Sequence, residues 1–211
     1  METENPRREI EEAISSGDLH WLLRISGMLH GHYCTYSALG VKAGARAMRE
    51  MGVRKSTGME EIIAIVETNN CFSDGVQMVT GCSFGNNALI FRDYGKTAFT
   101  LVRRNGQGLR IAVKPGGVEH RDPELAKLFR TVVVQRQGSD EEQERIRKAW
   151  VEMSFQLLDV PDEEVFTITP VSIEVPAYAR IFASVVCSVC GENVMESRVR
   201  LKDGRPVCLS C

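Results

Sequence analysis

Four cysteines near the end of the chain have the spacing of a metal site. They form two C-x2-C pairs, Cys187 with Cys190 and Cys208 with Cys211. Two sulfurs so spaced can bind one ion from a tight turn, and two such pairs supply the four thiolates of a tetrahedral zinc site. Four protein ligands leave no open position, so we predict a structural zinc whose binding folds a segment too short to bury a core. The alternatives are buried free cysteines or a redox pair, and a redox pair explains only one of the two motifs.

The charge around these cysteines argues against nucleic acid as their partner. Basic and acidic residues nearly balance there, so the segment lacks the excess of positive charge that binding to a phosphate backbone requires. We expect a folding clip or a protein-contact module, with nucleic-acid binding as the weakest alternative. The charged residues are Arg198, Arg200, Lys202 and Arg205, against Glu192, Glu196 and Asp203.

A second group of ligand residues lies near the start of the chain. His30, His32 and Cys34 stand close together, and Gly31 gives the backbone freedom to aim both imidazoles the same way. Histidine and cysteine are the preferred ligands of zinc and similar borderline metals. The alternative is a helix C-terminus with a histidine near its last carbonyl groups. Spacing alone leaves both interpretations open.

Cys71 and Asp74 add donors to this metal hypothesis. They follow a continuous apolar run at residues 62–66 and begin a predicted helix, whose positive end would lower the pKa of the Cys71 thiol. Asp74 has three interpretations: a metal ligand, a carboxylate that orients a histidine, or a helix cap. Cys82, in the turn after that helix, is predicted to be a small buried filler.

These segments together resemble the formylmethanofuran dehydrogenase E-subunit family. The resemblance covers roughly residues 25–115, and the cysteine tail is similar to a zinc-knuckle extension that some members carry. The motifs that carry it are His30-Gly-His-x-Cys34, the run Glu67-Thr-Asn-Asn-Cys71-Phe-Ser-Asp74-Gly75 continuing to Asn86, and Asp93-Tyr94-Gly95-Lys96.

The resemblance implies an α+β domain that tends to form homodimers and has a His/Cys-lined pocket suited to a transition metal, zinc or iron. The family name implies association with a molybdenum or tungsten enzyme that reduces carbon dioxide onto a methanofuran carrier. This chain has no ferredoxin-type run of cysteines and no Gly-rich dinucleotide fingerprint, so we do not expect it to be the catalytic dehydrogenase. The positions carried over as metal ligands are His32, Cys34 and Cys71, and more weakly His30 and Asp74, with Lys96 as a nearby positive charge.

The composition of the chain excludes several classes of protein. The chain has 211 residues, 43% hydrophobic and 26% charged, with a formal net charge of -2, which excludes a disordered chain and a bulk polyanion binder. No apolar run reaches the ~20 residues that cross a bilayer, and the polar N-terminus does not resemble a secretory signal. We therefore expect a cytoplasmic protein without membrane association. In that reducing compartment its 7 cysteines stay thiols unless a metal binds them.

The elements that must position His30, His32 and Cys34 are predicted to form an α+β fold, with helices packed on a small, mainly antiparallel sheet. We expect this domain over residues 1–182 and a small zinc-finger domain, ribbon-like or treble-clef-like, over residues 183–211. Small residues line the third helix, which predicts close packing against another backbone, within the chain or across a dimer. The predicted helices cover residues 7–16, 18–28, 35–51 and 73–80, and the predicted strands cover 62–66, 89–91 and 165–175.

Turn and cap residues refine this prediction. Asn105-Gly106 predicts a three-residue hairpin turn within residues 97–113, with Gly106 left-handed, which places the apolar residues of both arms on one face. Asp122-Pro123 begins another helix, and Ser139 with Glu142 forms a capping box for the last long one.

Three classes of function follow from these features. The first, which we favour, is a metal-binding protein with a structural zinc and a second His/Cys metal site. An open position there would activate water or a substrate, with Cys34, Cys71 and Lys96 as candidate catalytic residues. The second is an accessory or chaperone-like subunit that docks on a molybdenum or tungsten redox enzyme. The third is nucleic-acid binding by the zinc finger. Whether the protein is an enzyme stays open.

Overall fold

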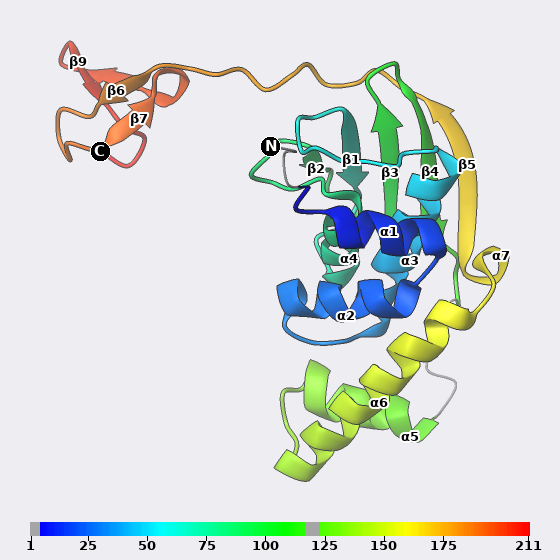
Figure 1. Ribbon diagram of the computed structural model, residues 1–211. Coiled ribbons are helices and arrows are strands. Elements are labelled where there is room, and N and C mark those ends of the chain that lie inside the picture. The colour runs from blue at the N-terminus through cyan, green and yellow to red at the C-terminus, as the bar shows by residue number, and fades with distance from the viewer. Residues whose placement is uncertain (1–4, 117–122) are drawn as a thin grey trace. The chain divides into compact units, whose positions relative to one another are not determined.

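The computed structural model describes residues 5–116 and 123–211. They form two compact units, Met1–Val175 and Pro176–Cys211, which we describe separately (Figure 1). The sequence places the boundary near residue 182, whereas in the structure residues 176–182 belong with the second unit. Within the described ranges, no helix is both long enough and apolar enough to cross a bilayer.

The first unit is built on a five-stranded sheet with the order β2-β1-β3-β4-β5. β1 and β2 pair in parallel, and all the other neighbours are antiparallel. Every residue of β1 is buried, which accounts for its uninterrupted apolar run. The strands are β1 (Ile62–Val66), β2 (Leu89–Phe91), β3 (Ala98–Arg103), β4 (Gln107–Val113) and β5 (Phe166–Ser172).

The hairpin of β3 and β4 has the predicted three-residue turn. Gly106 adopts a φ of 84°, in the left-handed region that glycine tolerates best. Leu101 therefore pairs with Leu109 and Phe99 with Ile111, so the apolar residues of both arms share one face. β5 completes the sheet at its edge, where the missing N–H of Pro170 is tolerated.

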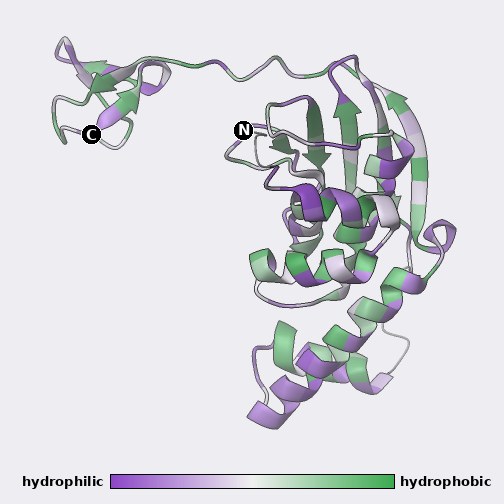
Figure 2. Ribbon diagram, viewed as in Figure 1, coloured by the Kyte–Doolittle hydropathy of each residue, from purple (hydrophilic) through white to green (hydrophobic). Residues whose placement is uncertain are grey.

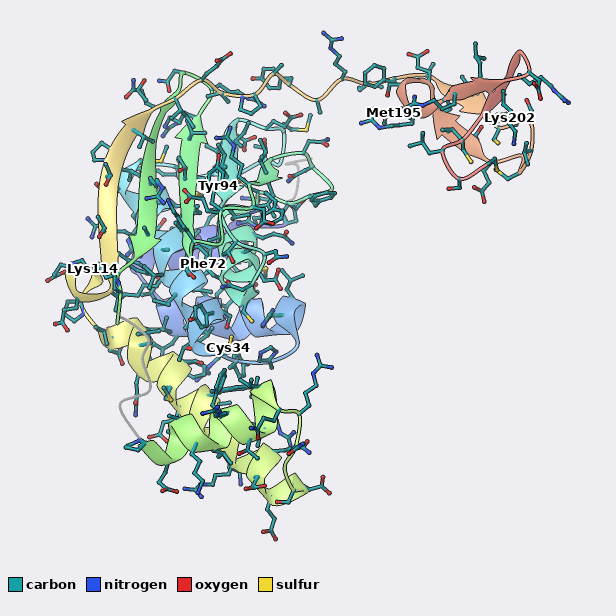
Figure 3. The ribbon with its side chains drawn as sticks, turned by 180° about the vertical axis from the view of Figure 1, so that it is seen from behind. Cys34, Phe72, Tyr94, Lys114, Met195 and Lys202 are labelled. Carbon is teal, nitrogen blue, oxygen red and sulfur yellow. The ribbon has the colours of Figure 1, made fainter. Side chains whose placement is uncertain are left out.

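Helices α3 and α4 pack against one face of this sheet (Figure 1). Phe72 of α4 is fully buried, and its ring centroid lies 6.1 Å from that of Phe99 on β3. Figure 3 places Phe72 in the layer between helices and sheet. The strands of the sheet are predominantly hydrophobic (Figure 2), as the burial of all of β1 and most of β3 requires. The first four helices are α1 (Arg8–Ser16), α2 (Leu19–His30), α3 (Thr35–Glu50) and α4 (Cys71–Thr80).

The small residues of α3 allow its backbone to touch that of α4. A Cβ atom on Gly40 would lie 2.0 Å from the carbonyl oxygen of Phe72, and one on Gly75 would lie 2.4 Å from that of Ser37. Further along, Gly44 faces Val79. The contacts advance in the same direction on both helices, so the two helices run roughly parallel and their N-terminal ends meet. The close packing predicted from the small residues is thus within the chain.

Residues 123–165, between β4 and β5, form a helical hairpin. Its elements are α5 (Pro123–Phe129), a π-helical turn η1 (Arg130–Val134), α6 (Asp140–Asp159) and the short α7 (Asp162–Val165). Asp122, the predicted first residue of α5, lies outside the described residues. The capping box of Ser139 and Glu142 at the start of α6 is confirmed, with N–H···O distances of 2.9 and 3.2 Å. The π-helical turn has no counterpart in the sequence prediction.

The second unit consists of two small antiparallel hairpins and a 3-10 turn. Cys187 and Cys190 lie in the turn of the first hairpin, and Cys208 and Cys211 follow the last strand of the second. The elements are β6 (Ser184–Val186), β7 (Asn193–Met195), η2 (Glu196–Arg198), β8 (Arg200–Lys202) and β9 (Arg205–Val207).

Candidate metal centres

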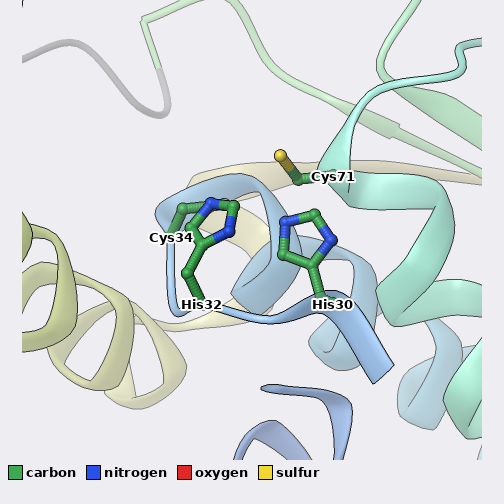
Figure 4. Close-up of side chains that lie close together, drawn as sticks. All are labelled: His30, His32, Cys34 and Cys71. Carbon is green, nitrogen blue, oxygen red and sulfur yellow. The ribbon is translucent and has the colours of Figure 1, made fainter. Parts of the chain in front are cut away.

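Three helix ends and one loop bring four ligand side chains together in the first unit. His30 is the last residue of α2, Cys34 is the N-cap of α3, and Cys71 is the first residue of α4. His32 lies in the loop between α2 and α3. One ligand atom from each lies within 4.8 Å of the other three (Figure 4). We call these residues the His/Cys cluster.

The contact between α3 and α4 accounts for this convergence. Their N-terminal ends meet because glycines let the backbones touch, and each end begins with or is capped by a cysteine. The Cys34 sulfur is further fixed as the helix cap. It accepts the backbone N–H of Ser37 at 3.4 Å, while the Ser37 hydroxyl oxygen accepts the backbone N–H of Cys34 at 3.3 Å.

His30 is held at one ring nitrogen and has no partner at the other. Its Nδ1 lies 2.7 Å from Oδ2 of Asp74, while Nε2 is buried without a hydrogen-bond partner among the described residues. A buried ring nitrogen without a partner is costly, and a bound cation would satisfy it. The arrangement fits a metal-binding histidine whose ring is oriented by a carboxylate.

Asp74 therefore differs from its predicted role as a ligand. Its carboxylate is engaged with Nδ1 of His30, and it is not one of the four residues whose ligand atoms gather. Of the three interpretations that the sequence allows for Asp74, the structure shows the one in which it orients a histidine.

The two thiols of the cluster share a proton unequally. The hydrogen bond from Cys71 lowers the pKa of Cys34 to about 5, and the Ser37 N–H and the charge of His32 add to this effect against the cost of burial. The same hydrogen bond, together with burial, raises the pKa of Cys71. The predicted low pKa at Cys71 is thus wrong, because the helix-capping thiol takes the negative charge first.

Two other predicted residues stand apart from the His/Cys cluster. Lys96 is exposed, and its backbone N–H donates to the carbonyl of Glu67. Cys82 is only 1% exposed, and its Sγ lies 3.7 Å from the carbonyl oxygen of Ile62, to which it donates. Burial raises the pKa of Cys82 to about 11, as expected for a neutral filler.

Trp150 is a neighbour of the cluster that the sequence did not predict. Its ring centroid lies 6.2 Å from that of His32, and Phe129 lies 6.3 Å beyond it on α5. Both residues belong to apolar helical stripes, whose spacing indicates a packed face and gives no sign of a nearby metal site. Only the fold of the α5–α6 hairpin reveals this neighbourhood.

The four cysteines of the second unit also form a compact group. One sulfur from each of Cys187, Cys190, Cys208 and Cys211 lies within 4.8 Å of the others. The backbone N–H of Cys208 donates to the Cys187 sulfur at 3.3 Å. Backbone N–H groups of Cys190 and Cys208 hold the pKa of Cys187 down, to about 6, which favours the thiolate that a metal requires.

Known protein families match the parts of the chain that hold the His/Cys cluster and the four cysteines of the tail. Residues 29–167 match the family model described as "FmdE, Molybdenum formylmethanofuran dehydrogenase operon". Residues 180–211 match the model of the prokaryotic dksA/traR C4-type zinc finger. The tail is thus a C4 zinc finger with a structural zinc site, as predicted.

One relative and one solved structure resemble most of the chain. A protein of Archaeoglobus fulgidus named "Probable S-adenosyl-L-methionine-binding protein" is 42% identical over 207 residues, 95% of this chain and 55% of the relative. The chain thus spans about half the length of that relative. The crystal structure of a tungsten formylmethanofuran dehydrogenase FmdE-like protein from Syntrophus aciditrophicus shares the fold. Its TM-score is 0.54 and its identity 22%, over 92% of this chain and 91% of that one.

The family match covers both histidines, Cys34 and Cys71, and most of the α+β unit. By this match, the chain belongs to the FmdE family, and it carries a C4 zinc finger after the family domain.

Proposed function

We propose that the His/Cys cluster binds one transition-metal ion, zinc or iron, and that this centre is the working site of the protein. The single observation that carries the proposal is the buried Nε2 of His30, which has no hydrogen-bond partner among the described residues. It lies among three further nitrogen and sulfur donors, while Asp74 fixes the opposite ring nitrogen. When bound, such a metal supplies Lewis acidity at a position beside two thiolates.

Metal analysis of matched variants tests this proposal. Protein purified without chelator should hold about two metal ions per chain, one in each centre, as four-donor sites of this kind bind one ion each. Cys34→Ser/Cys71→Ser should remove one of them and retain the zinc of the tail. Cys82→Ala is the matched control, because it removes a buried thiol outside the cluster and should leave the metal content unchanged. An unchanged content in the double variant would refute the proposal.

A role as an accessory subunit is a second proposal, and exposed apolar side chains on the zinc-finger unit support it. Val186, Val189, Leu201 and Leu209 are 57–77% exposed, which suits contact with another protein. We propose a molybdenum or tungsten redox enzyme as that partner, and a homodimer of the FmdE-like unit. Affinity capture from native extract should recover components of such an enzyme, and their repeated absence would count against it. Sedimentation measures the dimer.

The seven thiols favour a reducing compartment, and we propose the cytoplasm. The Archaeoglobus relative adds S-adenosylmethionine as a candidate ligand, because it is 42% identical over nearly all of this chain. Equilibrium dialysis of this chain with labelled S-adenosylmethionine tests that candidate. Binding would place the ligand site in the shared part, and no binding would assign it to the part of the relative that this chain lacks.

A further inference from the structure

The four ligands of the His/Cys cluster are held with unequal firmness. The side chain of His30 is 11% exposed and hydrogen bonded to Asp74, and Cys34 is 7% exposed and locked into a helix cap. Cys71 begins α4, which is packed backbone to backbone against α3. These three ligands therefore sit on rigid elements.

His32 is held less firmly than the other three ligands. It is exposed, and it lies in the short loop that follows Gly31, whose φ is 85°. Within the described parts of the chain, its ring makes no hydrogen bond or ion pair; its ring contacts are with His30 and Trp150, with centroids at 4.3 and 6.2 Å. Ring contacts of this kind contribute little beyond area burial, about 1 kcal/mol, so the ring can move at small cost.

The surroundings indicate what could take its place. The N-terminal ends of α3 and α4, helices of 16 and 10 residues, both meet at the cluster, and helix N-termini favour negative charge. Two thiolates would balance the charge of a divalent ion, and the positive helix ends would then favour an anion in the place of the exposed His32. Beyond His32 lies the ring of Trp150, a planar apolar group that Phe129 contacts edge to face, with 63° between the two ring planes.

From this asymmetry we infer that His32 is the exchangeable ligand of the centre. Its place is taken by the carboxylate of a ligand whose planar or apolar body packs on Trp150. In the exchange, the His32 ring leaves as a neutral imidazole with its own electron pair, and the carboxylate supplies the replacing pair. This inference rests on the proposed function, because it requires a metal at the cluster.

Cobalt substitution of the full chain tests the inference, with the absorption spectrum and the bound cobalt as readouts. Subtracting the spectrum of Cys34→Ser/Cys71→Ser removes the contribution of the zinc-finger site. We expect His32→Ala to lower cobalt affinity at the cluster by less than about tenfold, under 1.4 kcal/mol. His30→Ala should lower it by more than the roughly 10- to 100-fold seen when an outer partner of a ligand is lost. Benzoate should shift the difference spectrum of the wild type, and more strongly that of His32→Ala, whereas its neutral isostere benzamide should not.

The outcomes separate the two proposals. A wild-type difference spectrum without cobalt bands would refute the metal centre itself. Cobalt bands that His32→Ala abolishes as fully as His30→Ala would leave the centre standing and overturn the exchange. Equal responses to benzoate and benzamide would overturn the carboxylate ligand. Trp150→Leu should weaken benzoate binding with cobalt stoichiometry unchanged, and unchanged benzoate affinity would remove Trp150 from the ligand surface.

Discussion

The carboxylate of Asp74, on α4, lies 2.7 Å from Nδ1 of His30, the last residue of α2. The hydrogen bond fixes the ring of His30 so that its buried Nε2 faces the other donors of the cluster. One contact between two helices thus determines the direction in which a ligand atom points.

Removing this carboxylate should weaken metal binding at the proposed centre without abolishing it. Asp74→Ala is expected to lower metal affinity about 10- to 100-fold, because the ring loses its orientation and part of its basicity. Asp74→Asn should lose less, since an amide oxygen can still accept the Nδ1 proton. Competition with a chromophoric chelator measures both, with the exposed Asp93→Ala as control. Equal affinity in Asp74→Ala and Asp93→Ala would contradict the role.

The backbone contact of α3 and α4 predicts that a methyl group at Gly40 is costly. A Cβ there would lie 2.0 Å from a carbonyl oxygen, so Gly40→Ala must push the helices apart. We expect a loss of about 1–3 kcal/mol in the free energy of unfolding, from overpacking. Metal content at the cluster should fall as well, because Cys34 and Cys71 separate. Gly85→Ala, with no atom within 4 Å of its Cβ position, is the control for urea unfolding. Equal stabilities would argue against this contact.

The buried Cys82 predicts a loss of stability at alkaline pH. Its pKa rises from 9.0 to about 11 on folding, because burial favours the neutral thiol. This contribution is fully present below pH 9 and is lost as the pH rises to 11, and a shift of this size is worth about 3 kcal/mol at most. The difference in unfolding free energy between wild type and Cys82→Ala should shrink over that interval. Parallel curves for the two proteins would show that Cys82 does not titrate as predicted.

A buried ion pair ties α7 to α3. Lys42 is 4% exposed, and its Nζ lies 3.1 Å from Oδ1 of Asp162 and 2.8 Å from the carbonyl oxygen of Leu158. Asp162→Ala leaves a buried ammonium without its counter-ion and should cost about 3–5 kcal/mol. Lys42→Met should cost less, because Asp162 keeps its ion pair with Arg46 at 3.0 Å. Urea unfolding midpoints of the two variants measure this difference. A less stable Lys42→Met than Asp162→Ala would refute this account.

Removal of zinc from the tail should unfold that unit alone. Residues 176–211 form their own compact unit, with four cysteines where a larger domain has a core. After chelation, hydrogen exchange should become fast in β6 through β9 and stay slow in β1 and β3. Fast exchange in β1 as well would mean that the units do not unfold independently.

Much of this fold follows from local patterns in the sequence. Helix boundaries follow from caps such as Ser139 and stops such as Gly31, and the hairpin register follows from the turn at Gly106. The tail site follows from cysteine spacing alone, because two C-x2-C pairs can satisfy one ion without further geometry.

The rest depends on tertiary contacts that no local pattern encodes. The approach of Cys34 raises the pKa of Cys71, which its place at a helix start was expected to lower, because two thiols that share a proton cannot both ionise easily. Asp74 becomes a partner of His30 only once α2 and α4 lie side by side. Trp150 reaches His32 from a helix far along the chain.

The contact between the N-terminal ends of α3 and α4 has a consequence for the lifetime of the protein. Cys34 and Cys71 are separated in the chain by all of α3 and β1, so an ion held between them closes a long loop, as a disulfide would. Binding to the folded state alone also adds stability with each increase in free metal. Metal supply would then determine how long a copy survives proteolysis, and a starved cell would clear the empty protein first.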